Sequence, residues 1–284
     1  MTAGESTAEN KTPGRSNLTT RLISALVLGP LVLMLVFLGG WPFIGLVVVL
    51  AIVSLLEFYE LGRERDIPGN VAVGLVAVIL LLIIYAAEQY LLLLPLFLGS
   101  GILVFAWETI RNTQPTTLRW GRVAMTLGGL AYAGLPSAFL MVVRMRPDAL
   151  NWFAFIICVT WGTDTLAYFG GRFWGKHPLA PRISPKKTRE GAVVGVAFGV
   201  IAGIGVLALA GKLSVGAVVL ALLAPPLAVI GDLFESALKR YFGVKDSHLA
   251  HFNIIPGHGG VLDRTDALIW VTTLCYLYLL LTGG

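Results

Sequence analysis

Residues 192–211 read AVVGVAFGVIAGIGVLALAG, an unbroken apolar run without a charged side chain. About twenty apolar residues in a helix cross the hydrocarbon core of a bilayer. Similar runs recur along the chain, and we place the spans at 22–39, 42–61, 71–87, 90–107, 124–143, 150–170, 192–211, 213–231 and 266–282. A lipid-exposed segment must satisfy its own backbone hydrogen bonds, and these runs do not alternate in polarity as barrel strands do. The sequence therefore predicts an all-α polytopic membrane protein with about nine transmembrane helices.

Small residues and overall composition support this fold class. Gly191, Gly195, Gly199 and Gly203 recur at every fourth position, so they share one face of a helix and predict close packing against another helix. Charged residues make up only 13% of the chain, whereas about 25% is usual in soluble proteins. The composition thus excludes an ordinary soluble domain.

The distribution of basic residues predicts the topology. Of the 21 Lys and Arg residues, all but Arg144, Arg146 and Lys212 fall in the connections on one side of the membrane. Because basic loops stay in the cytoplasm, we expect a cytoplasmic N-terminus and an extracytoplasmic C-terminus. The net charge of +5 is then a topology determinant, and no nucleic-acid binding is expected.

This topology divides the chain and gives it a location. The short loops are typical of a bacterial inner (plasma) membrane protein, with an organellar membrane as the alternative, and we expect the active site to face the cytoplasm. The predicted regions are a disordered cytoplasmic tail (1–20), N-terminal membrane helices of about five spans (21–150) and a catalytic membrane region (151–284) with cytoplasmic loops 171–191 and 232–265.

Acidic side chains mark the membrane boundary of the two long loops: Asp164, Asp232, Glu235, Asp263 and Asp266. A carboxylate at membrane depth costs about 2.5 to 3.5 kcal/mol, so it tends to face a polar cavity, a partner or a metal ion. Such oxygen ligands suit Mg²⁺. Each of these acids also has a structural alternative. Asp164 could make a polar contact between helices, Asp232 could have a structural role, and Asp263 and Asp266 could cap the final helix. The four His residues show no zinc-site spacing.

Phosphate-binding groups accompany these acids. The turn PGHGG at 256–260 precedes the final helix, where exposed backbone amides can hold phosphate, although a simple loop is the alternative. Hydroxyl and basic groups from ISPKKT (183–188) and from the second loop can donate to phosphate oxygens. As topology determinants alone, these bases would need no function. The candidates in the second loop are Ser236, Lys239, Arg240, Lys245 and Arg264.

At this point the residues resemble a known family, the CDP-diacylglycerol synthases (phosphatidate cytidylyltransferases). The resemblance lies in GDLFES (231–236), in SALKRYFGVKDSHLAHFNIIPGHGGVLDRTD (236–266), in Asp164 with Ala167 and Tyr168, and in ISPKKTREG (183–191). It covers roughly residues 160–270. Two features depart from the family pattern: 248–252 resembles a small insertion, and Arg189 stands where an aromatic residue is common.

The resemblance implies Mg²⁺-dependent attack of a phosphatidate phosphate oxygen on the α-phosphorus of CTP, giving CDP-diacylglycerol and pyrophosphate. It assigns the metal centre to Asp232 and Asp263, with Asp164 and Asp266 as further ligands and a second cation as an option. The other catalytic residues are Lys239, Arg264 and His258, and the substrate-binding residues are Ser184, Lys186, Lys187, Ser236, Arg240, Lys245, Gly259 and Gly260. The expected partners are CTP, phosphatidate, the lipid bilayer and a second copy in a homodimer.

The sequence leaves two other functions open. One is a CTP-dependent enzyme that acts on another membrane lipid, such as an isoprenoid. The other is a transporter of an anionic substrate, which would also place carboxylates in the membrane. Clustering of the polar residues on one membrane side favours an enzyme over a transporter.

Overall fold

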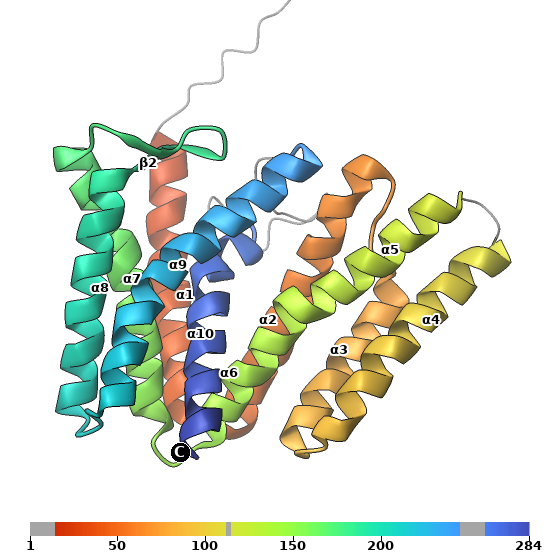
Figure 1. Cartoon of the computed structure of the whole chain (residues 1–284), viewed down its shortest axis with the longest axis horizontal. Helices are drawn as coiled ribbons and strands as arrows, with labels where there is room; N and C mark the ends of the chain where they lie inside the picture. Colours follow the sequence, from red (N-terminus) through yellow and green to blue (C-terminus); the bar gives the residue numbers. More distant parts are fainter. Residues whose placement is uncertain (1–14, 112–114, 245–258, 284) are drawn as a thin grey trace, which may run out of the picture.

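The computed structural model of the chain describes residues 15–111, 115–244 and 259–283, with side chains described from Leu26 onward. Within these ranges the chain folds into a bundle of helical rods (Figure 1). The α-helices are α1 (Arg15–Leu38), α2 (Gly40–Leu61), α3 (Val71–Ala86), α4 (Leu93–Arg111), α5 (Thr116–Gly129), α6 (Leu135–Met145), α7 (Ala149–Trp174), α8 (Arg189–Leu209), α9 (Val215–Phe242) and α10 (Leu262–Thr282). Short helical turns η1 (Gly62–Arg65) and η2 (Tyr90–Leu92) adjoin α2 and α4, and the π-helical turn η3 (Leu130–Gly134) joins α5 to α6.

The predicted fold class is confirmed. Seven of the rods in the described ranges are long and apolar enough to cross a bilayer, and α3 and the apolar part of α1 are shorter apolar helices. Each predicted span lies within one rod apart from at most two residues at an end, and α5, η3 and α6 continue as a single rod from Thr116 to Met145. The first turns of α1 lie at the opposite end of the bundle from the C-terminus (Figure 1).

At the end of the bundle where α1 begins, the helix boundaries differ from the predicted ones. Helix α1 begins at Arg15, within the segment assigned to the tail, and α9 continues to Phe242, well past the predicted end at 231. The added turns of α9 are rich in good helix formers. They end at Gly243, whose positive φ of 80° provides a left-handed cap, with Lys239 and Arg240 in the last turn where the helix dipole favours basic side chains.

A β-hairpin lies in the segment expected to be a plain loop. Strand β1 (Pro178–Ala180) pairs antiparallel with β2 (Ser184–Thr188), with Pro178 opposite Thr188. The hairpin, the last turns of α9 and the first turn of α10 lie at the same end of the bundle, called the site end below (Figure 1).

The predicted glycine face of α8 is confirmed as a packing surface against α7. All four glycines are buried, and a Cβ atom on Gly195 would meet the Thr163 carbonyl oxygen and the Ala167 side chain. Gly199 faces Thr163 and Pro225 in the same way. Because only hydrogen fits there, the backbones of α7 and α8 approach closely.

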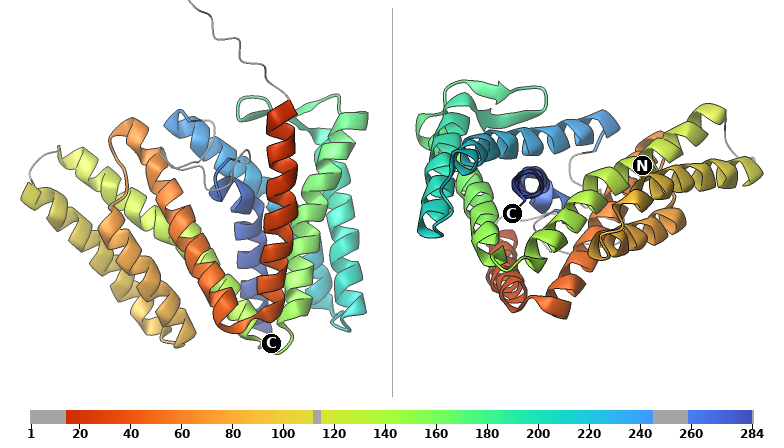
Figure 2. Two further views of the ribbon diagram at one scale, coloured as in Figure 1. Left: turned by 180° about the vertical axis from the view of Figure 1, so that it is seen from behind. Right: turned by 60° about the horizontal axis from the view of Figure 1, so that its bottom comes forward.

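Helix α10 lies among several other helices, in contact with α6, α7 and α9 and also with α2 (Figure 2). At the end away from the site, Asp148 accepts hydrogen bonds from Arg146 Nε at 3.1 Å and Trp152 Nε1 at 2.9 Å, and pairs with Lys212 Nζ at 2.6 Å. Partial burial alone would raise the pKa of Asp148, but the bonds from Lys212 and Trp152 and the charge of Arg146 lower it to about 2. This cluster joins the α6–α7 connection to the α8–α9 connection.

Candidate active site

A cavity of about 720 Å³ lies at the site end between α7, β2, α9 and α10. Its size is within the usual range for small-molecule sites. Basic side chains from all four elements line it: Arg172, Lys186, Lys187, Lys239 and Arg264. So do the four predicted metal ligands Asp164, Asp232, Asp263 and Asp266. The cavity therefore brings together donors for phosphate oxygens and acceptors for a cation.

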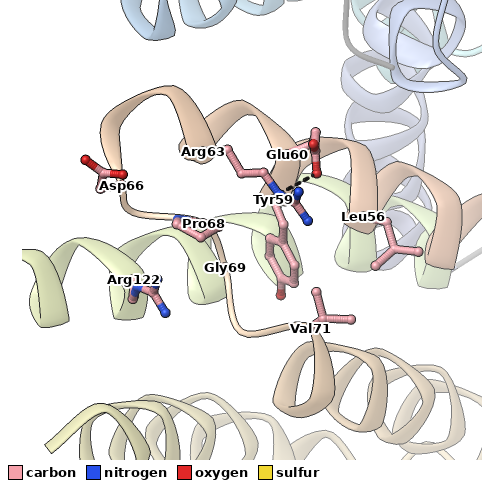
Figure 3. A pocket seen from close by; sticks show the side chains of 9 residues that line it. All are labelled: Leu56, Tyr59, Glu60, Arg63, Asp66, Pro68, Gly69, Val71 and Arg122. Atoms are coloured by element: carbon pink, nitrogen blue, oxygen red, sulfur yellow. Dashed lines mark ion pairs between the residues drawn. The ribbon is translucent and has the colours of Figure 1, made fainter. Parts of the chain in front are cut away.

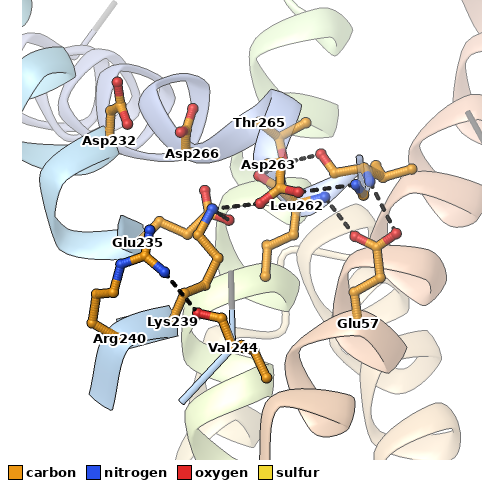
Figure 4. A network of polar contacts seen from close by, with 12 residues as sticks. Glu57, Asp232, Glu235, Lys239, Arg240, Val244, Leu262, Asp263, Thr265 and Asp266 are labelled. Atoms are coloured by element: carbon orange, nitrogen blue, oxygen red, sulfur yellow. Dashed lines mark hydrogen bonds and ion pairs between the residues drawn. The ribbon is translucent and has the colours of Figure 1, made fainter. Parts of the chain in front are cut away.

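Lys239 links α9 to α10 through an ion pair with Asp263 (Figure 4). Its Nζ lies 2.5 Å from Asp263 Oδ1 on α10 and 3.2 Å from Glu235 Oε1 one turn back on α9. The three side chains are only 12%, 9% and 0% exposed, respectively. Charges this deeply buried are stabilised by being paired.

The hairpin is held against α9 and α8 by polar contacts. Lys187 on β2 forms an ion pair with Asp232 on α9. Thr188 caps α8 by accepting a hydrogen bond from the Gly191 amide at 3.1 Å. Glu190 pairs with His177 Nδ1 at 2.5 Å, which fastens the start of the hairpin to the first turn of α8. These contacts place Ser184 and Lys186 on the cavity.

Carboxylates line the cavity from three helices: Asp164 on α7, Asp232 on α9, and Asp263 and Asp266 on α10. Within the described ranges, no three acidic, His or Cys side chains converge tightly enough to form a metal cage by themselves. Mg²⁺ commonly takes only one or two carboxylates and completes its shell with water and substrate phosphates, so the donors present fit that ion.

Side-chain carboxylates accept hydrogen bonds from the backbone amides at the start of α10. Gly260 donates its amide to Asp263 Oδ2 at 3.0 Å, and the amides of Val261 and Leu262 are donated to Glu57 of α2. Gly259 has a positive φ of 78°, and a Cβ there would collide with Asp263. The carboxylates of Asp263 and Glu57 thus already accept hydrogen bonds from these amides, and a phosphate that bound here would have to displace them.

A second cavity, of about 520 Å³, lies beside the site end of α2 (Figure 3). Both of its arginines form ion pairs nearby: Arg63 with Glu60 at 2.9 Å, and Arg122 with Glu108 at 3.0 Å. None of the predicted site residues that the structure describes lines this second cavity. The cavity between α7, β2, α9 and α10 is therefore the better candidate for the active site.

Most of the predicted site residues meet in that cavity: Asp164, Ser184, Lys186, Lys187, Asp232, Lys239, Asp263, Arg264 and Asp266. Ser236, Arg240, Gly259 and Gly260 do not line it, and Arg240 instead donates to the carbonyl oxygens of Ile183 and Val244. Lys245, His258 and the insertion at 248–252 lie outside the described residues.

Several side chains of the site were not among the predicted ones. From the sequence, Glu235 was expected at the membrane boundary with no assigned role, and Arg172 was expected only to help determine the topology. Trp161 and Tyr168 line the cavity from α7, with Tyr168 accepting from Arg172 Nη1 at 3.2 Å. Their spacing by about two turns on α7 is the signal that could have found them. Glu57 has no comparable signal, because its partners are backbone amides.

Comparison with known proteins gives a consistent result. A family model described as the cytidylyltransferase family matches residues 19–282. A phosphatidate cytidylyltransferase of Brucella abortus biovar 1 is 38% identical over 268 residues, which cover 93% of each chain. Proteins of the same name from Staphylococcus epidermidis and Bacillus subtilis are each 31% identical, over 93% and 92% of this chain and 98% and 97% of their own lengths.

Proposed function

This chain belongs to the cytidylyltransferase family, and we propose that it transfers the cytidylyl group of CTP to phosphatidate, forming CDP-diacylglycerol and pyrophosphate. The observation that carries the proposal is the cavity at the site end, where five basic and four acidic side chains face one space next to apolar helices. The relatives named phosphatidate cytidylyltransferase match nearly the whole chain.

The basic groups suit a triphosphate and a lipid phosphate. Lys186 and Lys187 on the hairpin and Arg264 on α10 approach the cavity from different elements, so they can hold phosphate groups on both sides of the reacting phosphorus. Nucleotidyl transfer requires chiefly in-line positioning and neutralisation of charge. The lipid phosphate oxygen is itself the nucleophile, and no nucleophile from the protein is needed.

Mg²⁺ is the cation that this donor set fits. We propose that Asp232 and Asp263 hold it, with Asp164 and Asp266 as further ligands. When bound, the ion neutralises developing charge on the attacking and leaving oxygens. Asp232→Asn should then lower turnover by more than about a hundredfold, since charge stabilisation of this kind contributes several kcal/mol. Near-normal turnover of this variant across a Mg²⁺ titration would remove Asp232 from the metal site.

The lipid would reach the cavity from the α7 side. Trp161 and Tyr168 line the cavity and are 51% and 60% exposed. Phe173 and Trp174 continue this exposed aromatic surface toward the end of α7. Aromatic side chains favour the membrane–water interface, where a lipid headgroup lies.

The seven long apolar rods indicate an integral membrane protein. We propose that it lies in a bacterial inner membrane with the site end in the cytoplasm, where CTP is available, and the predicted homodimer stays a prediction. A periplasmic reporter fused after Gly284 should be active. A reporter active only in the cytoplasm would contradict this orientation.

The reaction is tested with the purified protein in mixed micelles, labelled CTP and Mg²⁺. Pyrophosphate release should depend on phosphatidate and should be accompanied by labelled CDP-diacylglycerol. A parallel reaction with an isoprenoid phosphate separates the alternative lipid class. Turnover with the isoprenoid phosphate and none with phosphatidate would refute the proposed substrate.

A further inference from the structure

Glu57 on α2 contacts the catalytic helix α10 from the other half of the chain. Its side chain is 2% exposed. Oε1 accepts a hydrogen bond from the Val261 amide at 2.9 Å, and Oε2 accepts one from the Leu262 amide at 2.7 Å (Figure 4). Both carboxylate oxygens thus bind the first turn of a helix that follows about 200 residues later in the chain.

This contact replaces a local helix cap. The first amides of a helix have no partner within the helix and are usually satisfied by a Ser, Thr, Asp or Asn at the N-cap. In α10 the N-cap is Val261, which makes no side-chain cap bond. A carboxylate at this position also interacts favourably with the positive end of the helix dipole. Glu57 therefore provides the cap that the sequence of α10 lacks.

The same rod also holds the end of α9. Arg65 of η1 donates from Nη2 to the Tyr241 carbonyl oxygen at 2.5 Å, and its guanidinium lies 3.9 Å from the centre of the Tyr241 ring. Tyr241 is two residues beyond Lys239, which itself bonds Asp263 on α10. The rod of α2 and η1 thus contacts both helices that carry the buried Lys239–Asp263 pair.

We propose that Glu57 is a positioning residue, which fixes the first turn of α10 so that Asp263 and Arg264 face the cavity. The catalytic part of this inference rests on the proposed function. Because Glu57 does not line the cavity, its loss should change the placement of reacting groups more than the capture of CTP.

The test compares Glu57→Gln with Glu60→Gln, a matched control one turn along α2 whose carboxylate pairs with Arg63 rather than with α10. The glutamine keeps the size of the side chain but turns an amide donor toward a backbone amide. Hydrogen bonds to charged groups contribute enough that kcat should fall at least about tenfold. The KM for CTP should stay within about threefold, and the Glu60 variant should behave as the wild type.

Hydrogen–deuterium exchange provides a second readout that needs no turnover. In the wild type, the amides of a peptide spanning 259–268 should exchange slowly. In Glu57→Gln they should exchange faster, while a peptide from 192–203 in α8 stays unchanged. Fast exchange at Val261 and Leu262 in the wild type would overturn the proposal even if the variant fails to fold.

The remaining outcomes are also decisive. Wild-type kcat in Glu57→Gln, or a general loss of protection that includes α8, would show that Glu57 does not position the site. If the wild type protects these amides but does not turn over CTP with phosphatidate, the proposed function fails, while the faster exchange in the variant still decides whether Glu57 holds α10.

Discussion

Replacing Lys239 with methionine is the most informative perturbation of the site. The substitution keeps much of the side-chain volume and removes the positive charge between α9 and α10. Two buried carboxylates then lose their cation, Asp263 at 2.5 Å and Glu235 at 3.2 Å. Breaking a buried ion pair by removing one partner costs about 3 to 5 kcal/mol.

This cost predicts a clear loss of thermal stability. For a protein of this size each kcal/mol corresponds to a few degrees, so we expect the melting temperature to fall on the order of 10 °C. The assay is thermal unfolding of the detergent-solubilised protein, followed by tryptophan fluorescence. Turnover, measured as pyrophosphate release, should fall about a hundredfold or more, as expected when a preorganised donor to a reacting phosphate is lost.

The double variant Lys239→Met with Glu235→Gln separates the two effects. It removes one positive and one negative charge, so the net charge of the cluster returns to that of the wild type. Stability should recover only in part, because Asp263 still lacks its partner, and turnover should stay low because the ammonium group is still missing. Recovery of turnover in the double variant would show that Lys239 acts only by balancing charge. A melting temperature of Lys239→Met within about a degree of the wild type would refute the energetic reasoning.

Other elements of the fold yield further predictions. Lys187→Ala removes the ion pair that holds the hairpin to Asp232, so the KM for CTP should rise about tenfold in initial-rate measurements with little change in melting temperature. Gly195→Leu should prevent the close approach of α7 and α8 and lower the melting temperature, whereas Gly205→Leu, at a position with open space on the same helix, should not. The pKa of Asp148 is lowered to about 2 by folding, so its carboxylate stabilises the fold at pH values above its ordinary pKa of 3.8. Asp148→Asn should therefore lower stability on the order of 1 kcal/mol at pH 7, and the difference from the wild type should vanish as pH falls from about 4 to about 2, measured by thermal unfolding.

The membrane spans were predictable because lipid leaves a continuous apolar run only one stable conformation, the helix. The same reasoning gives no information where the chain leaves the hydrocarbon. From Asp232 to Phe242 the residues are polar enough for a loop and equally good helix formers, so the extension of α9 could not be read from hydropathy. The five residues of β2 are mostly polar and too short to show alternation.

The sequence predicted those candidate site residues whose side-chain types themselves indicate phosphate or cation binding. Acids and bases in the segments around Asp164, Lys187, Asp232 and Asp263 meet in one cavity, as the resemblance to the cytidylyltransferases implied. Glu57 could not be found in this way. A single glutamate at the end of an apolar run resembles any boundary charge, and its partners, backbone amides in a distant segment, have no side-chain signature in the sequence.

Mutual neutralisation explains how so many charged side chains can line one cavity. Lys187 pairs with Asp232, and Lys239 pairs with both Asp263 and Glu235, so these carboxylates are partnered by ammonium groups that line the same cavity. An entering triphosphate would compete for the lysines, and the released carboxylates would then be available to a cation. Because the charges exchange partners rather than lose them, binding avoids the large cost of an unpaired buried charge.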